Sequence, residues 1–246
     1  MGQTYTSQEL FAACLMRIAG DAESIGVYNT MPIPAAAALA IYARRKGDLI
    51  LSILGSFKYN KLFTGGVREQ YDFSAKGRMD LQFFSGGQID GAGNINLVGV
   101  DGYPHSRVRF GGSFGSALQY YTGRRTILFR QEHTRRVFVP KVDFISAPGS
   151  SPPGVHHPGG PVALVTDLCV MRFDRPRRRF VLESVHAGHS VRDVIDNTGF
   201  EFDMPEQVPQ TPAPTPEELE LLRGFARREV AEVYPTFAAT AFLGQA

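Results

Sequence analysis

Residues 83–96 read FFSGGQIDGAGNIN, and a second glycine-rich stretch, GGSFG, occupies residues 111–115. Each stretch directly follows a short apolar run, which places it at the end of a predicted strand. Glycine permits positive φ angles and a close approach of the backbone to a ligand, and clustered backbone amides attract negative charge. We call these stretches the first and second glycine elbow and expect them to bind an anionic group. Two ordinary tight turns are the alternative interpretation.

The segments before the elbows alternate between helical and strand patterns. A capping-box pattern opens a helix over residues 6–20, and an alanine-rich helix spans residues 34–46. Residues 25–28 and 49–54 are apolar throughout and read as buried strands. Helices that alternate with continuously apolar strands predict an α/β fold with a mostly parallel sheet covered on both faces.

The rest of the chain continues this pattern. A helix is expected at residues 113–121, a loop or lid at 147–160, a capped helix at 190–197 and a final helix from Thr215. The expected strands are residues 81–84, 106–110, 126–129, 142–145, 162–166, 169–173 and 180–184. We interpret residues 1–246 as one domain, in which residues 206–246 form a C-terminal extended segment and helix.

Composition excludes several classes of function. A net charge of +2 gives no reason to expect a nucleic-acid partner, and the arginines of residues 172–179 read as a hairpin tip. No apolar run approaches about 18 residues, so we expect neither a signal peptide nor a membrane span, and a cytoplasmic location. Cys14 and Cys169 read as buried small hydrophobic residues, and the histidines lack the spacing of a metal site.

Five motifs in order resemble the B-type subunit of class I coenzyme A (CoA) transferases, the group that includes glutaconate CoA-transferase. The motifs are residues 85–96, 112–115, 142–145, 165–168, and 184–188 with Thr-Gly-Phe at 198–200. The resemblance implies the three-layer fold of the NagB/RpiA/CoA-transferase superfamily. It also implies an A-type partner subunit in an α2β2 heterotetramer, and a CoA thioester at the elbows.

The sequence departs from that family at the end of the strand at residues 49–54. Class I transferases carry a glutamate nucleophile there, in a Glu-x-Gly setting, which forms a glutamyl-CoA thioester. This chain instead reads GSFKY at residues 55–59, and Glu69 lies too far beyond the strand to replace the missing group. Unless the alignment slips or the partner supplies a carboxylate, the covalent transfer route is lost.

An apolar site with oxyanion donors and no nucleophile suits a thioester that loses a carboxylate. The profile resembles family members that decarboxylate 3-methylglutaconyl-CoA to 3,3-dimethylacrylyl-CoA, on a route to isovaleryl-CoA, without a cofactor or a metal. Amide donors would stabilise the dienolate, and a proton donor would quench it. Ser56 is the candidate catalytic residue. The candidate CoA- and substrate-binding residues are Phe57, Phe84, Ser85, Gly86, Gly87, Gln88, Asn94, Asn96, Gly111, Gly112, Ser113, Phe114 and Gly115, with Ile53, Leu54 and Phe83 as further apolar lining.

Because a serine hydroxyl is a weaker acid than a thiol, whose pKa is about 8.5, we raise the hypothesis that Ser56 replaces a cysteine. Comparing the activity of the Ser56→Cys variant with this chain tests it. A small residue that merely ends a strand is the alternative for Ser56.

Other functions stay open at this point. They are a carbon–carbon hydrolase of steroid ring catabolism, a CoA transferase, and a non-catalytic subunit that only holds CoA. Release of carbon dioxide separates a decarboxylase from a hydrolase, and borohydride trapping of an enzyme thioester reveals a transferase.

Overall fold

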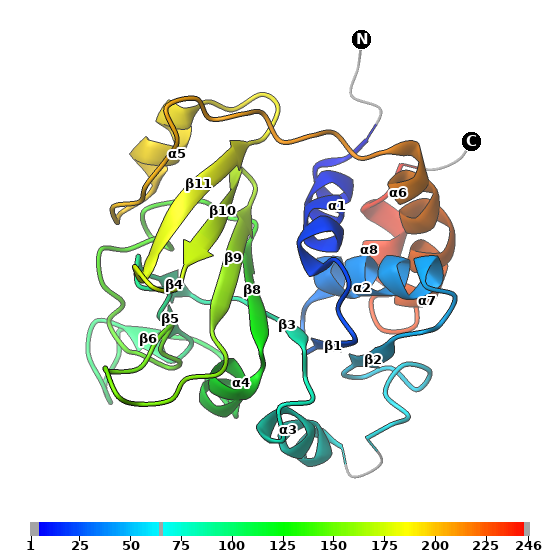
Figure 1. Cartoon of the computed structure of the whole chain (residues 1–246), viewed down its shortest axis with the longest axis horizontal. Coiled ribbons are helices and arrows are strands. Elements are labelled where there is room, and N and C mark those ends of the chain that lie inside the picture. The colour runs from blue at the N-terminus through cyan, green and yellow to red at the C-terminus, as the bar shows by residue number, and fades with distance from the viewer. Residues whose placement is uncertain (1–4, 64–65, 244–246) are drawn as a thin grey trace. The chain divides into compact units, whose positions relative to one another are not determined.

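A computed structural model describes residues 5–63 and 66–243 and divides the chain into two compact units (Figure 1). Unit 1 comprises residues 1–70, 80–83 and 212–246, and unit 2 comprises residues 71–79 and 84–211. The helix α3 (Val67–Ala75) runs from one unit into the other. That the whole chain is one domain stays a prediction.

Unit 1 combines three parallel strands with N-terminal and C-terminal helices. Its elements are α1 (Ser7–Ala19), β1 (Ser24–Val27), α2 (Pro32–Arg44), β2 (Ile50–Ile53), β3 (Leu81–Phe84, whose last residue is counted with unit 2), α6 (Pro216–Leu221), the π-helical segment η1 (Leu222–Ala226), α7 (Arg227–Val230) and α8 (Pro235–Thr240). β1 pairs in parallel with both β2 and β3, and every residue of β1 is buried.

Helix α2 forms the centre of the helical part of unit 1. Residues 35–41 are at most 1% exposed, and α2 contacts α1, η1 and α7. A helix that is apolar on all sides must be buried on all sides, and the small alanine side chains allow neighbouring helices to approach closely. Figure 1 accordingly shows the blue α2 beside the orange and red C-terminal helices. The helix begins at Pro32, two residues before the predicted start, because a proline fits the first helical turn.

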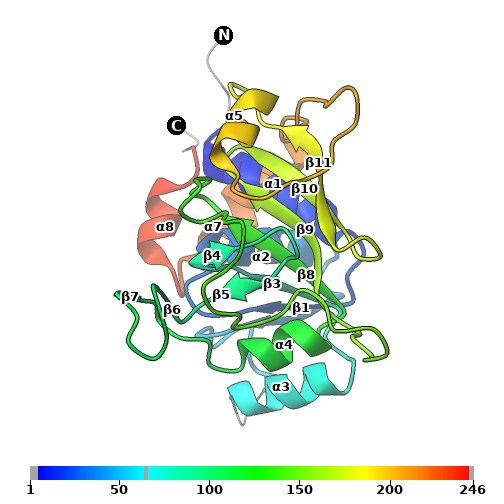
Figure 2. The same cartoon turned by 90° about the vertical axis from the view of Figure 1, so that its left-hand side faces the viewer.

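Unit 2 contains four longer strands and several small elements. They are β4 (Gln88–Ile89), β5 (Ile95–Asn96), β6 (Gly99–Val100), β7 (Val108–Arg109), α4 (Ser116–Thr122), β8 (Arg125–Arg130), β9 (Pro161–Thr166), β10 (Cys169–Asp174), β11 (Arg179–Val185) and α5 (Val191–Asn197). β8 and β9 pair in parallel, whereas β10 pairs antiparallel with β9 and β11. Figure 2 shows these four strands side by side. Parallel pairing in both units confirms the predicted α/β class with a mostly parallel sheet.

Several local predictions are confirmed by hydrogen bonds. Capping boxes open α1 at Thr6, α5 at Ser190 and α6 at Thr215. The arginine-rich segment forms the tip of the β10–β11 hairpin, where Arg177 and Arg179 pair with Asp203. Residues 147–160 form a loop, as expected.

Two predicted elements differ from the structure. Residues 142–145 form no strand; their backbone packs instead against polar side chains of the first glycine elbow. The helix expected from Ser113 begins only at Ser116, because positive φ angles at Gly112 and Phe114 keep the backbone before it out of the helical range. Among the helices of the described residues, none is long and apolar enough to cross a membrane.

Candidate active site

Ser56 lies in a tight turn directly after β2, in unit 1. The residue is only 6% exposed. The hydroxyl oxygen accepts hydrogen bonds from the backbone N–H groups of Lys58 (3.1 Å) and Tyr59 (2.9 Å). The hydroxyl donates its proton to Oε2 of Glu232 over 2.6 Å. The missing family glutamate is therefore replaced by a serine that contacts a carboxylate 176 residues away.

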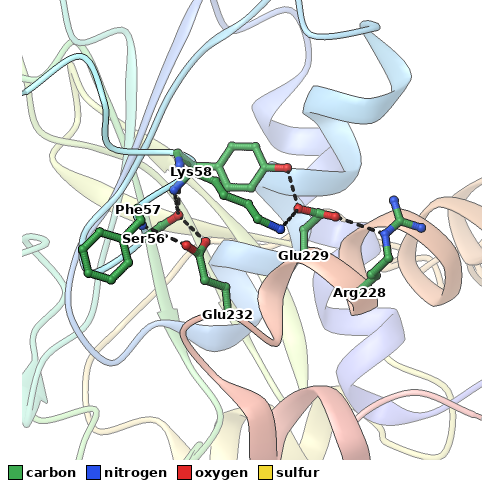
Figure 3. A network of polar contacts seen from close by, with 7 residues as sticks. Ser56, Phe57, Lys58, Arg228, Glu229 and Glu232 are labelled. Atoms are coloured by element: carbon green, nitrogen blue, oxygen red, sulfur yellow. Dashed lines mark hydrogen bonds and ion pairs between the residues drawn. The ribbon is translucent and has the colours of Figure 1, made fainter.

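Glu232 follows α7 and is held by the turn through both of its oxygens (Figure 3). Oε2 accepts from Ser56, and Oε1 accepts from the N–H group of Phe57 over 2.9 Å. Glu232 itself is an exposed residue, and Phe57 beside it is 88% exposed. The arrangement presents a fixed carboxylate next to an exposed aromatic ring.

Glu229, one helical turn before Glu232, binds the same turn of the chain. Its Oε2 accepts from Lys58 Nζ and from the Tyr59 hydroxyl, each over 3.0 Å, and its Oε1 accepts from Arg228. Burial raises the pKa of Glu229, but these hydrogen bonds outweigh that effect and leave the pKa below its ordinary value. Burial and the bond to Glu229 raise the pKa of Tyr59. Glu229 is thus an ionised anchor for the turn.

The first glycine elbow lies in unit 2 and uses its polar side chains to hold its own loop. Asn96 donates to Gln88 Oε1 (2.8 Å) and to the carbonyl of Gly99 (2.7 Å), and Gln88 donates to Asp143 (3.1 Å). Asn94 donates to Asp90 over 3.0 Å. The elbow continues into the β4–β5 hairpin. These amides therefore stabilise the loop, and their predicted contact with CoA stays a prediction.

The second glycine elbow, in the same unit, leaves backbone amides open. Gly112 has a φ of +99° and donates its N–H to Leu97 over 2.9 Å. The N–H groups of Ser113 and Phe114 have no hydrogen-bond partner among residues 5–63 and 66–243. Added Cβ atoms on Gly111 or Gly112 would meet nothing within 4 Å. An anionic oxygen can therefore approach these amides, as the sequence analysis expects of an oxyanion site.

The structure brings the two elbows together. The ring of Phe110, which leads into the second elbow, covers Gly87 of the first, and the N–H group of Phe110 donates to Val98 over 3.0 Å. Ser85 and Gly86 complete the first elbow before β4, and Gly115 lies against the ring of Tyr71.

The predicted apolar lining divides into buried and exposed residues. Ile53, Phe83 and Phe84 are at most 6% exposed, whereas Phe57 and Phe114 are 88% and 79% exposed. Phe84 packs edge-on against the fully buried ring of Tyr120. The first three side chains belong to the core of their units, and only Phe57 and Phe114 are open to a ligand or a partner.

Two motifs that carry the family resemblance meet in a buried polar network in unit 2. His133 lies between the hydroxyls of Thr166 (2.7 Å) and Thr198 (2.9 Å). His186 donates from Nε2 to the carbonyl oxygen of Thr166 over 2.9 Å, and its Nδ1 contacts the Thr211 hydroxyl. Burial lowers the pKa of both rings to about 4. Both histidines are therefore neutral structural groups.

Neither cysteine is poised for chemistry. Cys14 and Cys169 are buried and form no disulfide, as predicted, and burial raises the pKa of the Cys169 thiol to about 12. In the part of the chain that the structure describes, no three histidine, cysteine or carboxylate side chains are grouped to hold a metal ion.

A family model described as coenzyme A transferase matches residues 21–197, which extend through both units and include Ser56 and both elbows. The chain belongs to the coenzyme A transferase family. Two relatives of this CoA-transferase family chain are B-type subunits. It is 31% identical to that of 3-oxoadipate CoA-transferase from Pseudomonas knackmussii, over 89% of this chain and 84% of the relative. It is 30% identical to that of glutaconate CoA-transferase from Acidaminococcus fermentans, over 89% and 91%.

Solved structures share the fold of this CoA-transferase family chain. The decarboxylase AibA/AibB matches with a TM-score of 0.72 at 23% identity, covering 91% of this chain and 98% of that one. IpdAB of Rhodococcus jostii RHA1 matches with a TM-score of 0.77 at 24% identity, covering 92% and 99%. At these identities the likeness extends to the fold alone.

Sequence reasoning missed Glu229 and Glu232. Both lie in a charged helical segment, residues 217–232, whose pattern predicts an ordinary exposed helix face. No local signal connects them with a turn in the first quarter of the chain.

Proposed function

We propose that this chain is the B-type subunit of an enzyme that decarboxylates a glutaconyl-type CoA thioester, 3-methylglutaconyl-CoA to 3,3-dimethylacrylyl-CoA. An A-type subunit would complete the enzyme, as in relatives whose names denote one subunit of a pair. CoA enters as part of the substrate, and no other cofactor takes part. The observation that carries the proposal is the turn after β2, where the family's glutamate is absent and Ser56 and the exposed Phe57 stand instead.

The chemistry asks little of the protein. The substrate carboxylate is vinylogous to the thioester carbonyl, so its loss leaves a dienolate whose charge spreads onto the thioester oxygen. The open amides of Ser113 and Phe114 are suited to stabilise that oxygen, an effect typically worth about 3 kcal/mol for a well-placed donor. A proton then has to reach the γ carbon of the dienolate.

The test uses the co-purified complex of this chain with its A-type partner. We expect release of carbon dioxide from 3-methylglutaconyl-CoA, measured together with formation of 3,3-dimethylacrylyl-CoA by mass spectrometry. Consumption of the thioester without carbon dioxide would contradict the proposal and favour a hydrolase like the ring-cleaving relatives.

CoA transfer is the second candidate, because the relatives that match at 31% and 30% identity are named CoA-transferases. A transferase forms an enzyme-bound thioester, which borohydride reduces and traps. We expect no trapped adduct on this chain after incubation with the acyl-CoA; an adduct on a glutamate would establish transfer.

A further inference from the structure

The hydroxyl of Ser56 is fully occupied by its own chain. A hydroxyl has one proton and two acceptor positions. The N–H groups of Lys58 and Tyr59 fill both acceptor positions, and Glu232 takes the proton. Since the residue is also buried, Ser56 has no free position from which to give a proton to a substrate.

Glu232 has the free positions that Ser56 lacks. A carboxylate accepts about four hydrogen bonds, and Ser56 and Phe57 fill one on each oxygen. The residue is exposed, and it borders a shallow hollow that Ser56 and Tyr59 also line. Figure 3 shows its carboxylate facing the Ser56 turn with the ring of Phe57 beside it.

We propose that Glu232 is the group at this turn that exchanges a proton with the substrate, and that Ser56 is a positioning residue that fixes the Glu232 carboxylate. This inference rests on the proposed decarboxylation. It assigns the proton transfer to a residue from the C-terminal segment, which neither the glycine elbows nor the turn itself contains.

The step balances with solvent as the proton source. The bond between the γ carbon and the carboxylate breaks, carbon dioxide leaves, and the electron pair enters the dienolate. The protonated Glu232 carboxyl then gives its proton to the γ carbon, which forms the new C–H bond, and the resulting carboxylate regains a proton from water. In the reverse sense, the Glu232 carboxylate removes a γ proton from the product thioester.

The charged groups around Glu232 leave it as the available carboxylate. Glu229 already binds Lys58, Tyr59 and Arg228, which neutralise its charge. Lys58 and Tyr59 come from the turn, and Arg228 comes from α7. Among the contacts of the described residues, only Ser56 and the Phe57 amide bind the Glu232 carboxylate.

Exchange of γ protons isolates this step from decarboxylation. The purified complex is incubated with 3,3-dimethylacrylyl-CoA in deuterium oxide, and deuterium in the methyl groups is followed by NMR. We expect Glu232→Gln to slow exchange by about 10² to 10⁴ fold, because a shape-matched amide cannot carry the proton. Ser56→Ala should slow it only about tenfold, through loss of orientation.

The matched control is Glu229→Gln, which removes a carboxylate from the same segment and the same turn. We expect its exchange rate to stay within about threefold of the unsubstituted complex, with similar unfolding temperatures for all three variants. Exchange by Glu232→Gln within threefold of the unsubstituted rate would overturn the proposal. A larger loss in Ser56→Ala than in Glu232→Gln, or a borohydride-trapped adduct on Glu232, would overturn it as well.

The two proposals fail in different ways. Exchange that depends on Glu232, without release of carbon dioxide from 3-methylglutaconyl-CoA, would refute the decarboxylation and retain the assignment of Glu232. Release of carbon dioxide with exchange that ignores Glu232 would refute only the assignment. A complex that neither exchanges protons nor releases carbon dioxide would refute both.

Discussion

A Cβ atom on Gly87 would overlap the aromatic ring of Phe110. This contact joins the two glycine elbows, because Phe110 leads directly into the second elbow and Gly87 lies within the first. A glycine that the sequence suggests is reserved for a ligand is therefore required by a neighbouring side chain. The open amides of the second elbow are held in place by this packing.

Gly87→Ala should lower the free energy of unfolding by about 1 to 3 kcal/mol, because the added methyl group must displace the Phe110 ring. Urea unfolding followed by circular dichroism measures the change. Gly111→Ala is the control, since a Cβ there meets nothing within 4 Å, and it should stay within about 0.5 kcal/mol of the unsubstituted chain. Equal stability of both variants would contradict the role given to Phe110.

Gly112→Val should lower kcat/KM of the complex about 10² fold. Gly112 has a φ of +99°, which valine does not adopt without strain, so the amides of Ser113 and Phe114 would be displaced. Steady-state kinetics measure the loss, and Gly111→Val should retain activity. Full activity in Gly112→Val would remove the second elbow from the site. Retained turnover in Ser56→Ala and Glu232→Gln, with loss only in Gly112→Val, would favour a scaffold subunit.

Stability should fall as the pH drops from about 6.5 to about 4. Burial lowers the folded-state pKa of His133 and His186 to about 4, below the ordinary value near 6.5. Between these values the unfolded chain binds protons that the folded chain excludes, so acid favours unfolding by up to roughly 3 kcal/mol per ring. Above pH 6.5 this contribution is complete and constant.

Denaturant unfolding at a series of pH values measures this slope. The His186→Gln variant is less stable at neutral pH, but its stability should depend on pH about half as steeply between pH 4 and 6.5. An unchanged slope would show that other groups cause the acid sensitivity.

Glu9→Ala should destabilise the chain by about 3 to 5 kcal/mol. The Glu9 side chain is fully buried and accepts from Arg223 over 2.7 Å and from the N–H groups of Thr6 and Leu243. The substitution removes the carboxylate from the Arg223 guanidinium, and the loss of one member of a buried ion pair is costly. Thermal and urea unfolding test this.

The exposed pair of Arg192 and Asp196, joined over 2.9 Å, serves as the control for Glu9. Asp196→Ala should cost at most about 1 kcal/mol, because water screens both charges. Similar losses in the two variants would show that burial does not set the strength of these pairs.

Much of the fold could be predicted because its signals are local. The capping boxes at Thr6, Ser190 and Thr215 and the apolar run at β3 each lie within a few residues of the element that they define. Residues 142–145 show where this fails. Their apolar pattern predicts a strand, yet the N–H group of Asp143 donates to the Gln88 side chain over 3.0 Å, and no neighbouring strand of the described residues pairs with them.

The candidate site shows the same limit more sharply. Ser56 could be selected because a residue type expected of the family is missing at that position. Glu232 could not, because its distance of 2.6 Å from the Ser56 hydroxyl joins residues 176 positions apart, and an exposed helical glutamate has no distinctive sequence pattern.

By itself, the sequence determined the α/β class, the family, the two glycine elbows and the absence of the strand-end glutamate. These features depend on residue types and on periodicity over short spans. Only the tertiary structure decided which elbow amides remain open, that Gly87 serves Phe110, and that a carboxylate from the C-terminal segment binds the Ser56 turn. Such contacts form when distant segments pack together, and side-chain hydrogen bonds across that packing leave no periodic trace in the chain.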